Sequence, residues 1–336
     1  MSVYLNNIWK PVKHTIFKDD LWAEQIHNIG HKVLPLLNNM QINQLSELFK
    51  ATHKLDSAEG GMFYSIYSQD TKYRHKIYQN IGEILAPILE NHFKNYKMVL
   101  NSFVAKLSGP KSEFYLHQDT TGLDESKHSP LSLWIPLQDV DESNGCLGII
   151  PKSHHLFTPY RSISFPAPFD NIQNTAKKYL QPLKMKAGEV LIFDNRILHH
   201  SYSNNSGKNR IAVICGLFPK EAKMITCYKP EYKCGGKVEL IAHEDDFLLE
   251  GKNFLIDCQK RPETGKSLGW VEDLYPEISS EEFETLCKKH NIEKVTIKTF
   301  EPTNCNMLSE PNIEVKENIK TTIWDKVKQL ASFEKN

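Results

Sequence analysis

The spacing of apolar residues changes character once along the chain, near residue 97. Before that point, the stretches "NNMQINQLSELFKATHKL" and "KIYQNIGEILAPILENHF" repeat apolar residues at intervals of three and four. This spacing places them on one face of an α-helix. We therefore expect residues 1–96 to be mainly helical, with Pro87 kinking the second helix or starting a new turn.

From residue 97 to 220 the apolar residues instead form short runs bounded by Gly, Pro, Asn and Ser, which is typical of β-strands. The runs are "MVLNSFVAKL", "LSLWIPLQDV", "CLGIIP", "GEVLIFD" and "RIAVICGLF". No helix-length pattern regularly separates them, so an antiparallel sandwich or barrel is favoured over a parallel α/β sheet. Residues 160–182 interrupt the pattern as a polar, proline-containing insertion, which we expect to be a surface loop over one end.

The pattern after residue 220 is mixed. Ser279 and Glu282 have the spacing of a capping box, which predicts the start of a helix. Residues 319–333, "IKTTIWDKVKQLASF", are expected to form an amphipathic helix that packs on the body, on a second subunit or on another protein.

These patterns predict a single domain with three parts. Its divisions are a helical N-terminal part at 1–96, a β core at 97–220 and a C-terminal extension at 221–336 that packs on the core.

Composition narrows the choice of partner. The 41 basic and 41 acidic residues cancel, so bulk charge gives no reason to expect nucleic acid or an anionic membrane as a partner. The first residues lack the pattern of a secretory signal, and no run is apolar enough to span a bilayer. The seven scattered cysteines show no CxxC spacing and suggest reduced thiols. We expect a cytoplasmic protein that binds a small molecule; its oligomeric state stays open.

His117 and Asp119 stand one residue apart in "FYLHQDTTGLDESKH", at the end of an expected strand. Alternation along a strand sends both side chains to one face. An imidazole and a carboxylate suit a divalent transition metal, and a second histidine would complete the two-histidine, one-carboxylate face that binds iron. With fourteen histidines in the chain, a chance pair in a surface loop is the alternative.

A candidate for the second histidine follows the run "AGEVLIFDNRIL". Beyond it, Arg210 stands at the start of the next β run, where its guanidinium could form a bidentate pair with a carboxylate. A dicarboxylic 2-oxo acid could then bind iron at one end and Arg210 at the other. This arrangement suggests 2-oxoglutarate as a cosubstrate.

Three blocks together resemble the phytanoyl-CoA dioxygenase family of Fe(II)- and 2-oxoglutarate-dependent oxygenases. They are "SEFYLHQDTTGLDE", "LSLWIPLQDVDESNGCLGIIPKSHH" and "KAGEVLIFDNRILHHSYSNNSGKNRIAV", in the family's order and across about a third of the chain. The resemblance implies a mainly β fold, with a double-stranded β-helix (jelly roll, cupin-like) core flanked by helices.

The resemblance also implies roles for individual residues. His117 and Asp119 match the first two iron ligands. His199 is expected to be the third, because this choice places Ser201 and Arg210 at the family's positions, with the neighbouring His200 as the alternative.

Two further residues are expected to contact the cosubstrate. Ser201 would donate a hydrogen bond to its distal carboxylate beside Arg210, with a structural turn serine as the alternative. Trp134 would form a wall of the cosubstrate pocket, with a plain core tryptophan as the alternative.

The implied activity consumes O2 and 2-oxoglutarate, releases succinate and CO2, and oxidises an unactivated C–H bond. Because the carboxylate of Asp119 is present, we expect hydroxylation, desaturation or ring formation rather than halogenation. A free small metabolite is the expected substrate, although family membership does not choose it. A carrier-tethered or peptide substrate, or a catalytically inactive jelly-roll binding protein, are the alternatives.

Overall fold

The structure is a computed structural model that describes residues 11–53, 61–156, 160–251 and 260–295. The amphipathic stretch 319–333 lies outside these residues, so the helix expected there stays a prediction.

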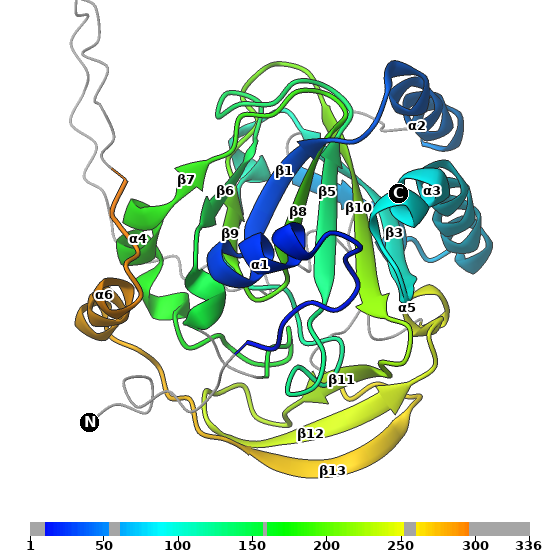
Figure 1. Cartoon of the computed structure of the whole chain (residues 1–336). Coiled ribbons are helices and arrows are strands. Elements are labelled where there is room, and N and C mark those ends of the chain that lie inside the picture. Colours follow the sequence, from blue (N-terminus) through cyan, green and yellow to red (C-terminus); the bar gives the residue numbers. More distant parts are fainter. Residues whose placement is uncertain (1–10, 54–60, 157–159, 252–259, 296–336) are drawn as a thin grey trace, which may run out of the picture.

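Two antiparallel sheets form the core. The larger sheet has six strands, in the order β1 (His31–Pro35), β8 (Glu189–Asp194), β5 (Leu131–Pro136), β10 (Arg210–Pro219), β3 (Tyr96–Leu107) and β2 (Gly61–Tyr64). The smaller has four, in the order β4 (Phe114–His117), β9 (Leu198–Ser201), β6 (Leu147–Ile150) and β7 (Gln181–Pro182). Between β3 and β10 the chain passes repeatedly from one sheet to the other (Figure 1). This alternation is the double-stranded β-helix, which confirms the predicted fold.

Apolar side chains fill the space between the two sheets. Trp134 from β5 and Leu191 and Phe193 from β8 pack in one cluster with Leu147 and Ile149 from β6. These residues alternate with outward-facing ones along their strands, so each sheet contributes one face to this core.

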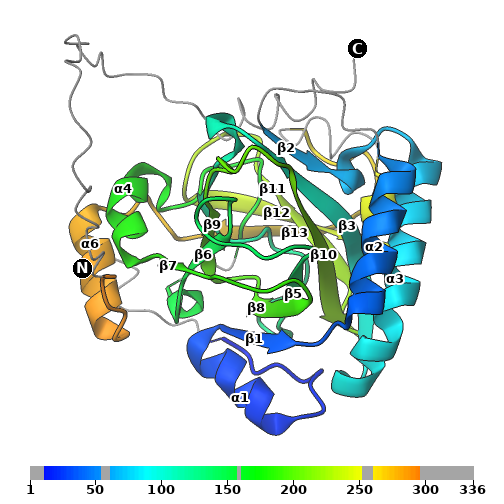
Figure 2. The ribbon, with the colours of Figure 1, turned by 90° about the horizontal axis from the view of Figure 1, so that it is seen from above.

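Helices cover the outer face of the larger sheet (Figure 2). They are α1 (Asp20–Ile29), α2 (Asn39–Thr52) and α3 (Thr71–His92). The stripe Ile77, Ile81, Leu85 and Ile88 of α3 is buried, as its spacing predicts. The helix does not restart at Pro87, because buried residues on both sides of the proline hold one continuous helix against the sheet.

The N-terminal part also contains β1 and β2, which form the two edges of the larger sheet and were not expected. The described residues also include five short 3-10 helices: η1 (Ser65–Tyr67), η2 (Pro110–Ser112), η3 (Ser153–His155), η4 (Asp170–Ile172) and η5 (Lys177–Tyr179).

The insertion at 160–182 is not the surface loop that its composition suggested. It contains the short helix α4 (Gln173–Ala176), and its residues Phe169, Ile172 and Tyr179 are buried in a cluster with Phe283 of α6 (Ser280–Lys289). The insertion is therefore packed as a wall beside the smaller sheet. The capping box of Ser279 and Glu282 is confirmed at the start of α6.

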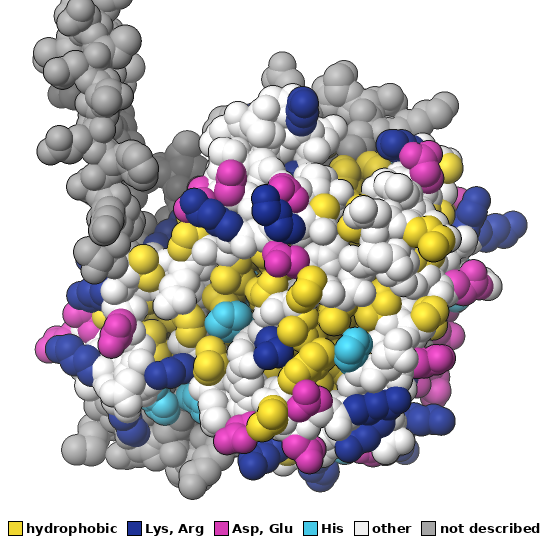
Figure 3. Space-filling model, turned by 45° about the horizontal axis from the view of Figure 1, so that its top comes forward, with side chains coloured by type: hydrophobic (Ala, Val, Ile, Leu, Met, Phe, Trp, Pro, Cys, Tyr) yellow, Lys and Arg dark blue, Asp and Glu magenta, His cyan; other side chains and the backbone are white. Residues whose placement is uncertain are grey.

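The C-terminal extension adds a third antiparallel sheet of β11 (Met224–Tyr228), β12 (Gly236–His243) and β13 (Lys266–Asp273), with the short helix α5 (Phe247–Glu250). Figure 1 shows it below one end of the jelly roll. On the face drawn in Figure 3, basic and acidic side chains are interspersed. Among the described helices, none combines the length and apolar character needed to cross a bilayer.

Candidate metal centre

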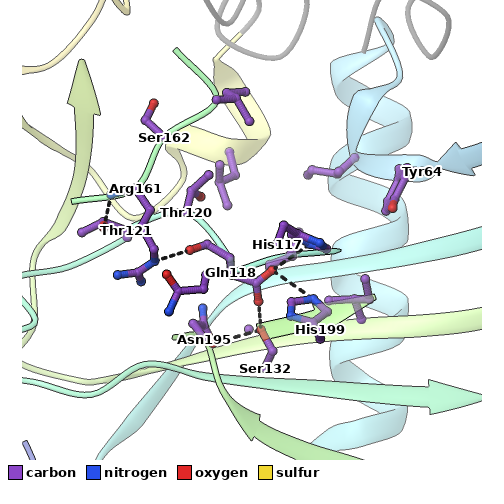
Figure 4. A pocket seen from close by; sticks show the side chains of 18 of the residues that line it. Tyr64, His117, Gln118, Thr120, Thr121, Ser132, Arg161, Ser162, Asn195 and His199 are labelled. Atoms are coloured by element: carbon purple, nitrogen blue, oxygen red, sulfur yellow. Dashed lines mark hydrogen bonds and ion pairs between the residues drawn. The ribbon is translucent and has the colours of Figure 1, made fainter. Parts of the chain in front are cut away.

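The pairing of β4 with β9 brings two histidines together. His117 and His199 stand opposite one another in the antiparallel register, with ring centroids 4.1 Å apart. Asp119 follows β4, and its Oδ1 lies 3.9 Å from Nε2 of His117 and 3.7 Å from Nε2 of His199. Figure 4 shows the two labelled imidazoles converging on one point of the pocket. The three side chains expected from the sequence as iron ligands are therefore neighbours in space.

The backbone fixes which nitrogen of each ring faces Asp119. Nδ1 of His117 lies 2.9 Å from the carbonyl oxygen of Tyr115, and Nδ1 of His199 lies 3.1 Å from that of Ile197. Since a carbonyl only accepts, each Nδ1 donates a hydrogen bond to it, and Nε2 is the nitrogen of each ring that is directed toward Asp119 and could coordinate a metal. Burial and the neighbouring His199 hold the pKa of His117 well below its usual value. Its ring is neutral at pH 7, as a metal ligand must be.

Asp119 is held by two partners that sequence reasoning missed. The Ser132 hydroxyl lies 3.0 Å from Oδ2 of Asp119 and also 3.0 Å from Oδ1 of Asn195, and the Asp119 N–H donates to the Asn195 carbonyl at 2.9 Å. These contacts leave Oδ1 directed at the two imidazoles. The sequence does contain a signal for Ser132, because it is the one polar residue in the apolar run "LSLWIP" and a buried hydroxyl needs a hydrogen-bond partner.

Replacing Ser132 with alanine should weaken metal binding by about 10- to 100-fold, because groups that orient a ligand contribute to affinity in that range. The measurement is a competitive titration with Co(II) against a chelating dye. Ser143→Ala removes an exposed turn hydroxyl and serves as the matched control. Equal affinities in the two variants would show that Ser132 does not position the carboxylate.

The alternative ligand His200 points away from this cluster. Its Nε2 lies 2.8 Å from Oε1 of Glu113, and its ring packs edge-on against Tyr202. Consecutive residues of a strand face opposite sides, which explains why His199 and His200 separate. The geometry favours His199 as the third ligand.

Arg210 is buried in the same pocket, and no described carboxylate pairs with it. Its side chain is 1% exposed, and its Nε and Nη1 have no hydrogen-bond partner among the described residues. Burial lowers the pKa of Arg210 to about 10, so the guanidinium is charged at pH 7. It lies over the ring of Trp134, with 5.2 Å between the guanidinium carbon and the ring centroid. A buried cation of this kind is costly unless an anion pairs with it.

Ser201 also lines the pocket, and its hydroxyl donates to the Gly145 carbonyl at 3.3 Å. This bond is the one expected of a structural serine, so its contact with a cosubstrate stays a prediction. Trp134 is 3% exposed and lines the pocket while also belonging to the core between the sheets.

The donor set fits a transition metal with a dicarboxylate cosubstrate. Among the described residues, His117, Asp119 and His199 are the one group of three whose ligand atoms lie within 4.8 Å of one another. Two imidazoles and one carboxylate suit non-haem Fe(II), and they leave coordination positions open. The pocket has a volume of about 330 Å³ and also contains the unpaired guanidinium of Arg210, which matches a carboxylate.

Comparison with known proteins agrees with this chemistry. A family model described as phytanoyl-CoA dioxygenase (PhyH) matches residues 38–212, slightly more than half of the chain. The rice protein phytanoyl-CoA dioxygenase 1 is 31% identical over 124 residues, covering 36% of this chain and 44% of the rice protein. A protein of that name from Arabidopsis thaliana is 26% identical over 155 residues, covering 44% and 53%. The chain thus spans about half the length of these curated relatives.

Solved structures give more distant likenesses. EctD from S. alaskensis with bound Fe is 18% identical, with a TM-score of 0.45, over 65% of this chain and 84% of that chain. HygX from Streptomyces hygroscopicus with nickel, 2-oxoglutarate and hygromycin B bound is 14% identical, with a TM-score of 0.43, over 61% and 88%. The ligands named are those of EctD and HygX. The family match itself is decisive: this chain belongs to the phytanoyl-CoA dioxygenase family, the family of Fe(II)- and 2-oxoglutarate-dependent oxygenases that the three sequence blocks indicate.

Proposed function

We propose that this protein is an Fe(II)- and 2-oxoglutarate-dependent dioxygenase that oxidises an unactivated C–H bond of a small metabolite. For a hydroxylation, substrate R–H, O2 and 2-oxoglutarate become R–OH, succinate and CO2, with one oxygen atom entering each of the first two products. His117, Asp119 and His199 would hold the iron. The observation that carries the proposal is the buried, unpaired Arg210 in the same pocket as this triad.

The chain's own residues would position the reactants. Bound iron and 2-oxoglutarate together supply the oxidising chemistry. Arg210 would pair with the distal carboxylate of 2-oxoglutarate, and the Trp134 ring would fix the plane of the guanidinium. Arg210 and Trp134 are both buried, so this end of the pocket is shielded from water, which strengthens the ion pair.

The proposal predicts a spectroscopic signature that needs no substrate. Anaerobic addition of Fe(II) and 2-oxoglutarate should produce a weak visible metal-to-ligand charge-transfer band, because a 2-oxo acid that chelates Fe(II) absorbs there. Glutarate, which lacks the 2-oxo group, is the control and should give no band. Folded protein that gives no band with 2-oxoglutarate would contradict the proposal.

Turnover then separates an enzyme from an inactive binding protein. Under air, the loaded protein should convert 2-oxoglutarate to succinate, and metabolite pools that contain the substrate should accelerate this conversion. A band without succinate under any pool would identify an inactive binding protein. A free metabolite is proposed over a carrier-tethered or peptide substrate.

A further inference from the structure

The pocket continues past the metal ligands into a chamber with an aromatic wall. Tyr64, Tyr67, Phe114 and Tyr115 all line it. Their rings are contiguous, with centroids 5.3 Å apart for Tyr64 and Tyr67, 6.4 Å for Tyr64 and Phe114, and 4.8 Å for Phe114 and Tyr115. Figure 4 shows Tyr64 across the pocket from Arg161, beyond the two imidazoles. A surface of aromatic rings attracts apolar groups and also cations.

Four described residues that line the pocket carry formal charges at pH 7: Asp119, Arg161, Asp170 and Arg210. Asp119 belongs to the metal centre, and Arg210 is assigned to the cosubstrate. The Arg161 guanidinium is neutralised, because its Nη1 and Nη2 donate to the two carboxylate oxygens of Glu125 at 2.9 and 2.5 Å. Its Nε donates to the Asp119 carbonyl at 2.7 Å. The charge and the hydrogen-bond donors of Arg161 are therefore engaged within the protein, so Arg161 is a poor binding partner for an anionic substrate.

Asp170 is the remaining charge, and no described Lys or Arg pairs with it. One of its oxygens, Oδ2, accepts the N–H of Ala167 at 2.9 Å, and Asp170 forms no ion pair with any described residue. Burial, with a smaller contribution from Glu277, raises the pKa of Asp170 to about 6. The carboxylate is thus mostly ionised at pH 7 although it is largely desolvated.

Hydrogen bonds tie the segment that carries Asp170 to strand β4, which contributes Phe114 and Tyr115 to the aromatic wall. The side chain of Gln173, one turn further along, accepts the Leu116 N–H at 3.1 Å and donates to the Leu116 carbonyl at 2.9 Å. These two bonds fix η4 and α4 to strand β4 at the residue after Tyr115. Burial raises the pKa of Tyr115 well above its usual value, and the negative charge of Asp170 raises it further, which is consistent with the proximity of the two side chains.

We infer, on the basis of the proposed function, that the substrate carries a protonated amine that pairs with Asp170 beside the aromatic wall. The ammonium group supplies the cation that this carboxylate lacks, and the aromatic faces of the wall favour the same charge. An anionic group at this position meets Asp170 and finds no uncommitted cation among the described lining residues. The apolar body of the substrate fills the rest of the chamber.

The test compares three probes that share one body: 4-phenylbutylamine, 4-phenylbutan-1-ol and 4-phenylbutanoate. Their binding to the full chain loaded anaerobically with Fe(II) and 2-oxoglutarate is followed by the change in the charge-transfer band. The amine should bind at least tenfold more tightly than the alcohol, and the acid most weakly. In Asp170→Asn, which keeps an oxygen for the Ala167 N–H, the preference for the amine over the alcohol should disappear.

Glu277→Gln is the matched control, since Glu277 is an exposed carboxylate near Asp170 that does not line the pocket. It should keep the preference for the amine. Equal binding of amine and alcohol to the unmodified protein, no detectable binding of the amine, or equal losses in both variants would overturn the assignment of Asp170. Absence of the band before any probe is added would instead count against the oxygenase itself, so the two failures are distinguishable.

Discussion

Asp119→Ala should abolish metal binding and turnover together. Oδ1 of this carboxylate lies 3.9 and 3.7 Å from the two imidazole Nε2 atoms, and its loss leaves two imidazoles and no negative charge among the ligands. Loss of a residue that only orients a ligand costs about 10- to 100-fold in metal affinity, so loss of the ligand itself should cost more than about 100-fold. Equilibrium dialysis with Fe(II) or Co(II) measures the affinity, and the charge-transfer band should be absent.

The two adjacent histidines provide a matched control within the same strand. His199→Ala should lose metal in the same way as Asp119→Ala. His200→Ala removes an imidazole bonded to Glu113 and should bind metal as the unmodified protein does. If His200→Ala lost metal binding and His199→Ala kept it, the assignment of His199 as the ligand would be overturned.

The proximity of the triad could be predicted from local rules only in part. Strand alternation is enough to place His117 and Asp119 on one face, because a two-residue period is intrinsic to extended backbone. Bringing His199 to them depends on the pairing of β4 with β9, and those residues are far apart in the sequence. Local periodicity carries no information on which strands pair, so this step came from the family resemblance, which the family match confirms.

The edge strands β1 and β2 and the helical turns of the insertion were not predicted, because their sequence signals are short. Strands β1 and β2 have five and four residues, and such short segments become strands through their pairing with β8 and β3 rather than through propensity. In the insertion, the buried apolar residues Phe169, Ile172, Ala176 and Tyr179 are three or four positions apart, a helical spacing that the expectation of a surface loop overlooked. The signal is short, and the structure forms only the brief helical turns η4, α4 and η5 from it.

The residues that surround the site were missed for a related reason. Ser132 and Asp170 are ordinary polar residues in sequence, and each becomes notable only through what lies beside it. Ser132 faces Asp119 from β5 of the opposite sheet, and Asp170 lines the pocket without an ion pair to any described residue. Hydrogen bonds between distant segments and the absence of a counterion are properties of the folded state alone.

Arg210→Met should raise the dissociation constant of 2-oxoglutarate about thirty-fold to several thousand-fold. Removing one partner of a buried charge pair costs about 2–5 kcal/mol, and each 1.4 kcal/mol corresponds to about a tenfold change. Methionine keeps apolar contact with Trp134, so the change is chiefly the loss of charge. Titration calorimetry with the Co(II)-loaded protein gives the constant. Lys208→Met removes an exposed cation two residues away and should leave it unchanged.

A cosubstrate analogue that lacks the distal carboxylate tests the same contact from the side of the ligand. 2-Oxopentanoate keeps the chelating end of 2-oxoglutarate but ends in a methyl group, so it should bind much more weakly than 2-oxoglutarate to the unmodified protein and about equally to Arg210→Met. A variant that still prefers 2-oxoglutarate by the original factor would show that another group reads the distal carboxylate. The apoprotein of Arg210→Met should be no less stable to heat, because the substitution removes a buried charge that no described carboxylate neutralises.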